Sequence, residues 1–112
     1  MTLNELQSTV DTWITEHGVR YFNELTNTTL LMEELGELSR LISRSYGEQS
    51  FKAGTEPTDL KLAIGDEMAD ILFVLTCLAN QMNIDLEIAM QQNLRKKTER
   101  DGSRHHNNPR LQ

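Results

Sequence analysis

The sequence is poor in cysteine, proline and aromatic residues, and these scarcities exclude several classes of protein. The single cysteine, Cys77, cannot build a disulfide framework, and its position in an apolar run is typical of a small buried hydrophobe in a reducing compartment. No apolar run reaches the ~20 residues that cross a bilayer, and the first residues lack the basic and apolar segments of a signal peptide. We therefore expect a soluble, cytoplasmic protein with no membrane partner.

Positive charge is also scarce. Eleven Lys and Arg residues stand against seventeen Asp and Glu residues, which gives a formal net charge of −6 and an isoelectric point near 5.0. That balance argues against a nucleic-acid polymer as partner, although an acidic protein can bind an anion when a metal ion lies between them. The sequence also lacks a Gly-rich phosphate loop and any Ser or Cys nucleophile motif.

Apolar residues recur at helical intervals up to Gly102 of the 112 residues, and no segment has the alternation of a strand. We predict an all-α protein of four main helices in an antiparallel bundle, as one domain over residues 1–102 with a flexible tail over 103–112. A chain of this size gains from oligomerisation, because assembly buries further apolar surface. The expected helices span residues 2–16, a start between 23 and 29 up to 46, residues 58–82, and residues 85–102.

The second expected helix places acidic side chains beside its apolar stripe. Glu33 lies about 160° from Leu31 on a helical projection, where a solvated charge belongs. Glu34 and Glu37 lie on the flank of the stripe, where two like charges repel and partial burial makes each carboxylate costlier. A nearby cation would offset that cost. The stripe itself is expected to contain Leu31, Leu35, Leu38 and Ile42.

The third expected helix carries a glutamate in the middle of its apolar stripe. Glu67 lies within about 40° of four apolar residues, and Asp70 lies about 60° to one side. Buried glutamate is rare unless it is paired or binds a metal, and two antiparallel helices with acid-x-x-acid would bring four carboxylates together. Oxygen ligands alone favour Mg²⁺ or Mn²⁺ over zinc, and neither an EF-hand loop nor a Glu-x-x-His di-iron pattern is present. The four apolar neighbours are Leu60, Ile71, Val74 and Leu78.

Several residues have both a structural and a functional interpretation. Tyr21 and Phe22, two of only six aromatic residues, plug the helix ends or form a stacking wall for a ring. Gly36 allows close approach of another helix or leaves room beside a metal. Residues 47–59 are a surface loop, in which Lys52 is either solvated or functional.

The last turns of the fourth helix are basic on one face. Cations near a helix C-terminus interact favourably with the helix dipole, and they are equally suited to hold a phosphate group. His105 and His106 are adjacent and not one helical turn apart, so they are poor helix-borne metal ligands. The residues that lie within about 60° of one another on this face are Asn93, Lys96, Lys97 and Arg100.

The third helix is apolar nearly all round from Met68 to Ala79. Leu72 and Phe73 point well away from the stripe that contains Glu67. A helix with two apolar faces is buried on both sides, so we expect the second face to meet another subunit.

Three features of the sequence together resemble those of one known family. They are similar to the MazG-type all-α nucleoside triphosphate pyrophosphohydrolases, and more narrowly to the short single-domain members, over about residues 20 to 104. The 29 residues between Glu37 and Glu67 are at the long end of the family's spacing, and the extra length falls in the 47–59 loop. The features are EELGEL at 33–38, GDEMADILFVLTCLAN at 65–80, and Lys96 and Arg100 in a K-x-x-x-R arrangement.

The resemblance implies roles for named residues. The metal ligands, which are also the catalytic residues, would be Glu34, Glu37, Glu67 and Asp70. The phosphate contacts would be Lys96 and Arg100, with Asn93 and Lys97 as weaker candidates. The base contacts would be Trp13, Tyr21 or Phe22.

The resemblance also implies an activity. The enzyme would cleave a nucleoside triphosphate between its α- and β-phosphates with Mg²⁺, giving a monophosphate and pyrophosphate, and would act as a homodimer or homotetramer in nucleotide-pool house-cleaning. The alternative is a helical interaction module of the same fold that binds Mg²⁺ only for stability. The sequence leaves open the preferred base and sugar, canonical against damaged nucleotides, the number of metal ions and the choice of dimer or tetramer.

Overall fold

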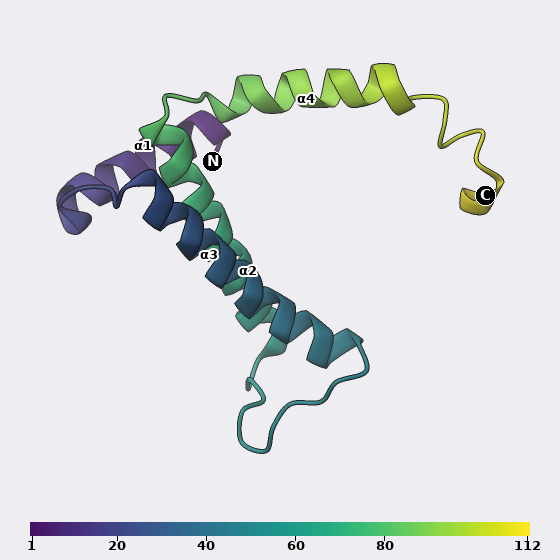
Figure 1. Ribbon diagram of the computed structural model, residues 1–112, viewed down its shortest axis with the longest axis horizontal. Helices are drawn as coiled ribbons and strands as arrows, with labels where there is room; N and C mark the ends of the chain where they lie inside the picture. The colour runs from purple at the N-terminus through teal and green to yellow at the C-terminus, as the bar shows by residue number, and fades with distance from the viewer.

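The computed structural model describes residues 1–112 and contains four α-helices and no strand, which confirms the predicted all-α class (Figure 1). The first helix continues through a π-helical turn, Ile14–Gly18, and the tail contains one short 3-10 helix, Pro109–Leu111. None of the helices has the length together with the apolar character that a bilayer crossing requires. The helices are α1 (Leu3–Trp13), α2 (Glu24–Tyr46), α3 (Leu60–Gln81) and α4 (Leu86–Asp101).

Each α-helix begins at a polar side chain that accepts a hydrogen bond from the backbone N–H three residues further on. Thr2 caps α1 and Asp85 caps α4, at the first residues of the two expected spans, and Asn23 caps α2 at the early end of its expected range. Asp59, one residue after the predicted start at Thr58, caps α3. Such a cap contributes about 0.5–2 kcal/mol, so the helix starts follow from the local sequence.

α2 and α3 form an antiparallel hairpin joined by the loop 47–59, in which Lys52 is exposed (Figure 1). The predicted α2 stripe is partly wrong, because Leu35 and Ile42 are 53% and 37% exposed while Glu34 is half-buried. Covered positions on α2 recur at alternating steps of three and four residues. This is the spacing of two helices that pack with their axes nearly antiparallel, as in a coiled coil. The helical projection had centred the stripe on all the apolar residues of the helix, including Leu35 and Ile42, which a single chain leaves exposed. The covered residues at this spacing are Asn27, Leu31, Glu34, Leu38 and Leu41.

α1 packs against the C-terminal half of α3 and buries a small core. Phe73 packs against this core, and Trp13 meets it edge-on with ring centroids 5.5 Å apart and an interplanar angle of 88°. Part of the second apolar face of α3 is therefore covered by α1 of the same chain, whereas Leu72 remains 43% exposed. The core residues are Val10, Ile14 and Cys77.

α4 runs away from the hairpin, and only its first turn is tied to α1 (Figure 1). Asn4 Nδ2 donates to Glu87 Oε2 at 3.0 Å, and the Gln7 amide bonds the backbone of Ile84 and Leu86 at 2.8 and 2.9 Å. The radius of gyration is 17.9 Å, against about 13 Å for a compact chain of this length. Within a single chain, α4 therefore does not pack against the α2–α3 hairpin to complete the predicted antiparallel bundle.

Candidate metal centre and active site

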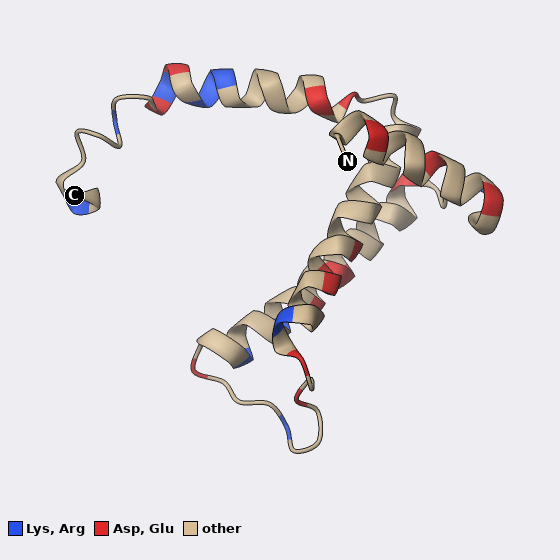
Figure 2. Ribbon diagram, turned by 180° about the vertical axis from the view of Figure 1, so that it is seen from behind, with Lys and Arg blue, Asp and Glu red and all other residues tan.

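Three carboxylates meet on the α2–α3 hairpin, where Figure 2 shows acidic residues along both helices. Glu34 comes from α2, and Glu67 and Asp70 come from α3. One oxygen of each lies within 4.8 Å of one oxygen of the other two, and all three residues are half-buried. The antiparallel hairpin thus brings the two acidic motifs together at one place.

Glu37, the fourth predicted ligand, lies at the rim of this group. It is exposed and its carboxylate falls outside the set of three, although it is close enough to raise the pKa of Glu67. Gly36 beside it has open space, because a Cβ there would meet no atom within 4 Å. No other helix of the same chain packs against Gly36, so the close-approach interpretation finds no partner within one chain.

The acidic group has no cation of its own. The ion pairs of the chain all involve other acids, and no Lys or Arg pairs with these four. Glu34 Oε2 and Glu67 Oε2 are buried and have no hydrogen-bond partner. Buried carboxylate oxygens without a partner are costly, and an oxygen-only set of donors suits a hard divalent ion. The residues present therefore fit a divalent metal.

The same crowding changes the protonation of the group. Burial, with the neighbouring Glu34 and Glu37 carboxylates acting in the same direction, raises the pKa of Glu67 to about 7. Burial also raises the pKa of Glu34 above its ordinary value. Without metal, the site holds a proton at acidic to neutral pH; a bound cation would favour the ionised form instead.

An open pocket of about 400 Å³ lies beside Asp70. Trp13 and Phe73 form its aromatic walls, and Thr9 adds a hydroxyl group at its edge. Of the three predicted base contacts, Trp13 is the one that lines a pocket shared with the acidic group. Thr9 and Phe73 were missed from the sequence, because no pattern within one helix shows where α1 packs on α3. The pocket is lined by Thr9, Val10, Trp13, Asp70 and Phe73.

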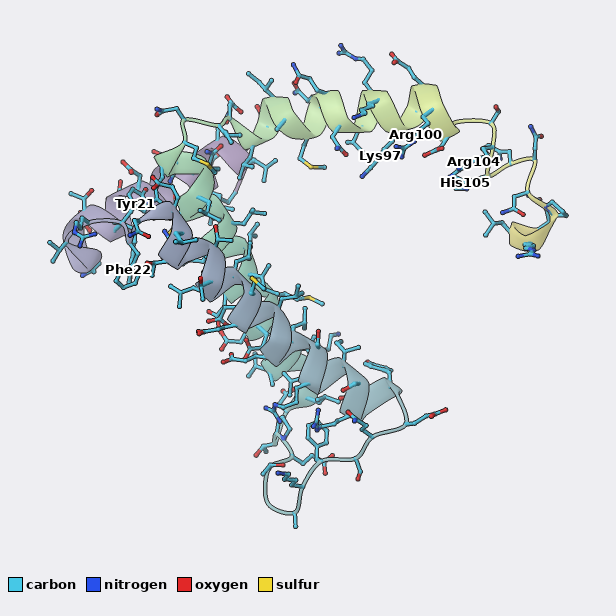
Figure 3. The ribbon with its side chains drawn as sticks, viewed as in Figure 1. Tyr21, Phe22, Lys97, Arg100, Arg104 and His105 are labelled. Carbon is cyan, nitrogen blue, oxygen red and sulfur yellow. The ribbon has the colours of Figure 1, made fainter.

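Tyr21 is occupied in a structural role. Its hydroxyl donates to Asp11 Oδ1 at 2.6 Å and accepts from Asn80 Nδ2 at 3.0 Å, and burial together with the Asp11 contact raises its pKa to about 12. Phe22 is 58% exposed, and both residues precede α2 (Figure 3). The start of α2 at Glu24 is itself about 15 Å of helix rise from Glu34. The structure therefore favours the plug interpretation for Tyr21 and leaves Phe22 away from the acids.

The predicted phosphate contacts lie on α4 and are all exposed. Figure 2 shows the basic residues of α4 in its C-terminal half, on the helix that leaves the hairpin. Arg100 pairs with its neighbour Asp101. Its Nε donates to Asp101 Oδ2 at 2.9 Å, and its Nη2 lies 2.9 Å from the same oxygen. One chain therefore does not bring these residues to the carboxylates. They are Asn93, Lys96, Lys97 and Arg100.

An all-helical chain whose antiparallel hairpin holds facing acid-x-x-acid motifs fits the class of all-α nucleotide pyrophosphohydrolases. Comparison with known families agrees, because the MazG nucleotide pyrophosphohydrolase domain matches residues 22–105. The chain belongs to the MazG family and is an enzyme of the nucleoside triphosphate pyrophosphatase class.

Individual relatives support the same assignment. The protein YpjD of Bacillus subtilis (strain 168) is 38% identical over 103 residues, which are 92% of this chain and 89% of that protein. The crystal structure of Bacillus subtilis YpjD matches with a TM-score of 0.73 at 38% identity, over 86% of this chain and 94% of that one. The crystal structure of the Bacillus-conserved MazG protein, a nucleotide pyrophosphohydrolase, matches with a TM-score of 0.69 at 35% identity, over 86% and 88%.

Proposed function

We propose that the protein is a Mg²⁺-dependent enzyme that cleaves a nucleoside or deoxynucleoside triphosphate to the monophosphate and pyrophosphate, as cytoplasmic house-cleaning of the nucleotide pool. The observation that carries this proposal is the meeting of Glu34, Glu67 and Asp70, two of which have buried oxygens without a partner. The family match supports the reaction, and the donor set supports the choice of Mg²⁺, with Mn²⁺ as a substitute.

The four carboxylates have two proposed roles at the reacting phosphorus, namely metal binding and acceptance of a proton. Glu34, Glu37, Glu67 and Asp70 would hold the ion, which when bound neutralises phosphate oxygens and makes water more acidic. A carboxylate of this group accepts the proton of the attacking water. Glu67 is the candidate of this group, because a bound cation would keep its carboxylate in the ionised form that can accept a proton.

The nucleoside end of the substrate belongs in the pocket beside Asp70. Trp13 and Phe73 offer apolar faces on which a base ring can stack, and stacking on an aromatic side chain contributes about 1–3 kcal/mol. Phe22 remains a weaker candidate, and Tyr21 serves the α1–α3 contact instead.

The outer phosphates need positive charge that the hairpin does not carry. Lys96 and Arg100, with Asn93 and Lys97 beside them, are the candidates, and they lie on the helix that extends away from the carboxylates. A homodimer or homotetramer in which one copy presents α4 to the hairpin of another would unite the two sets. Assembly is thus part of the proposal.

Turnover of a panel of nucleotides tests the proposal. With Mg²⁺ present, we expect release of one pyrophosphate per monophosphate, followed by ³¹P NMR or by coupled assay. The alternative, a helical module stabilised by Mg²⁺ without catalysis, predicts metal binding with no pyrophosphate released from any canonical or damaged nucleotide. That result would remove the catalytic assignment and leave the metal site standing.

Metal binding should raise stability, because a divalent ion favours the folded form in which the carboxylates are close. Raising free Mg²⁺ to 100 times its dissociation constant should increase the melting temperature by about 10 °C. Differential scanning fluorimetry over a Mg²⁺ titration in chelator-treated buffer measures this. A melting temperature that stays constant to saturation would count against the site.

Removing the Trp13 ring should weaken substrate binding more than it slows chemistry. We expect Trp13→Ala to raise KM about tenfold and to change kcat by less than about threefold, because the ring contacts the base and not the reacting phosphate. Phe22→Ala is the comparison, because Phe22 is the weaker candidate and its exposure of 58% is similar to the 49% of Trp13. Equal effects of the two variants would contradict the pocket assignment.

A further inference from the structure

Gln7 of α1 holds the backbone at the point where α4 begins. Its Nε2 donates to the Ile84 carbonyl oxygen at 2.8 Å, and its Oε1 accepts from the Leu86 backbone N–H at 2.9 Å. These two backbone groups flank Asp85, the N-cap of α4. The N–H groups of a first helical turn have no partner within their own helix, so a side chain of α1 completes the start of α4.

The amide of Gln7 is itself held in one orientation. The Ile84 carbonyl requires a donor and the Leu86 N–H requires an acceptor, which fixes the places of Nε2 and Oε1. Nε2 also donates to Asn80 Oδ1 at 3.0 Å. Asn80 Nδ2 donates to the Gln7 carbonyl oxygen at 2.9 Å and to the Tyr21 hydroxyl oxygen at 3.0 Å. The start of α4 is therefore tied through Gln7 to α3 and to the segment before α2.

Few other contacts fix the direction of α4. Asn4 Nδ2 donates to Glu87 Oε2 at 3.0 Å, still in the first turn. From residue 88 to the end of α4, no hydrogen bond or ion pair joins it to α1, α2 or α3. Figure 1 shows the helix extending away from the hairpin beyond that turn. The contacts at its start therefore decide where its far end lies within one chain.

The length of α4 magnifies any change at its start. The helix rises about 15 Å from Leu86 to Lys96 and about 21 Å to Arg100. A tilt of ~10° at the first turn would move the backbone at Arg100 by about 4 Å. A hydrogen bond to a phosphate oxygen requires a distance of ~3 Å, so it would not survive that displacement. A change at Gln7 is therefore expected to act on residues far along the helix.

We infer that Gln7 is a positioning residue of the enzyme, which sets the direction of α4 and thereby the place of the basic residues that α4 carries. The inference rests on the proposed function, in which Lys96 and Arg100 contact the outer phosphates. Gln7 lies outside the acidic group and does not line the pocket beside Asp70. It would therefore act on the substrate only through α4.

Gln7→Met removes these side-chain hydrogen bonds with little change of shape. Methionine has a similar length and helix propensity, but it has no amide donor or acceptor. The freed groups of Asn80 and Ile84 line an open pocket of about 500 Å³, where water can replace the amide, so we expect the variant to fold. Gln7→Ala, which gives water more room, is the second variant if the methionine disturbs the fold.

Gln81→Met is the matched control. Gln81 is also half-buried, and its amide likewise makes two kinds of contact. Nε2 donates to the Phe22 carbonyl oxygen, and Oε1 accepts from Asn27 Nδ2 at 2.8 Å. These bonds join α3 to the start of α2 and leave α4 untouched. The control therefore loses a comparable amide contact without a change at the start of α4.

The angle between α3 and α4 can be measured in the whole protein by double electron–electron resonance. Spin labels at Lys61→Cys and Glu99→Cys, both at exposed positions, report the separation of the hairpin and the far part of α4. Cys77 is 3% exposed, and burial raises its pKa to about 11, so it stays unlabelled. Labelled chains are diluted in unlabelled chains of the same variant, so that the distances are those within one chain.

Gln7→Met should shift the mean distance by about 4 Å or more, or at least double the width of the distribution, whereas Gln81→Met should do neither. An unchanged distribution in Gln7→Met overturns the inference. An equal change in the two variants also overturns it, because the effect would then follow from a general loss of stability.

Turnover tests whether the direction of α4 matters to the substrate. Gln7→Met should lower kcat/KM for a triphosphate about tenfold, and Gln81→Met less than twofold. In a chain that also carries Lys96→Ala and Arg100→Ala, Gln7→Met should lower it less than about threefold, because contacts already removed cannot be lost again. A full tenfold loss in that background would show that Gln7 acts by another route and would overturn the inference.

The two measurements separate this inference from the proposed function. Movement of α4 in Gln7→Met without any loss of kcat/KM overturns the inference, while the proposed function stands. A wild type that hydrolyses no nucleotide removes the proposed function, and with it the role of Gln7 in catalysis. The distance measurement then still decides whether Gln7 holds the direction of α4.

Discussion

Glu67→Gln should produce a protein that, without metal, is at least as stable as the wild type and that hydrolyses nucleotide at least 100-fold more slowly, a loss of about 2.7 kcal/mol of transition-state stabilisation. The amide keeps the shape of the side chain and removes one ionisable group from a crowded cluster of acids. Activity should fall, because the change removes a proposed metal ligand that would also be the proposed proton acceptor. Pyrophosphate release and thermal melting in EDTA measure the two effects.

The stability difference should depend on pH in a defined direction. The pKa of Glu67 in the folded protein is about 7, above its ordinary value of 4.5, so the folded state binds the proton more tightly than the unfolded chain does. The resulting stability is fully present below about pH 4.5 and is lost as the pH rises through 7. Apo wild type should therefore weaken between pH 5 and 8, while Glu67→Gln should weaken less over that range.

A control on the same hairpin separates site effects from charge effects. Glu33 is exposed on α2 and lies outside the acidic group, so Glu33→Gln should alter neither turnover nor the Mg²⁺-dependent melting shift by more than about twofold. If Glu67→Gln instead unfolds the protein while the remaining folded fraction keeps wild-type turnover, Glu67 is a structural residue and the site assignment fails.

If the protein assembles as proposed, Leu72→Asp should dissociate the oligomer and lower turnover at least tenfold. Met68, Leu72 and Leu75 share a face of α3 and are between 42% and 51% exposed in one chain, and a charge at a buried contact costs several kcal/mol. A monomer also leaves Lys96 and Arg100 on a helix that extends away from the carboxylates. Light scattering at micromolar concentration and a turnover assay measure both effects.

The matched control places the same charge on an exposed leucine outside this face. Leu111 is 61% exposed in the tail, so Leu111→Asp should leave both assembly and turnover unchanged. A wild type that is monomeric at micromolar concentration would contradict the prediction directly, and full activity in a monomeric Leu72→Asp variant would show that one chain suffices for catalysis.

Mixing two inactive variants tests how the site is completed. The Glu67→Gln chain lacks one proposed metal ligand, and the Lys96→Ala chain lacks one proposed phosphate contact. If each site takes these two residues from different chains, a mixed oligomer contains some sites in which both residues are intact. Activity should then reappear after subunit exchange, to roughly a quarter of the wild-type value for random dimers with independent sites. No recovery after confirmed exchange would place both groups in the same chain.

Helix positions and the acidic motifs were determined by the sequence alone. The caps at Thr2, Asn23 and Asp85 act within one turn of chain, so their effect can be read from neighbouring residues. The placement of Glu67 among apolar neighbours follows from the period of a single helix, which needs no knowledge of other elements. The same reasoning places Asp70 one turn from Glu67, and in the structure both residues lie in the acidic group with Glu34.

The tertiary structure decided which helix faces are covered. The period of α2 allows several neighbouring stripes, and packing against α3 selected the one that contains Glu34 and left Leu35 and Ile42 exposed. The role of Tyr21 likewise depends on Asn80, 59 residues away, and the wall of Trp13 and Phe73 depends on where α1 packs on α3. Contacts between distant segments depend on chain direction after each loop, which local periodicity does not encode. For the same reason only the structure showed that α4 leaves the hairpin, so that its basic face and the carboxylates are separate within one chain.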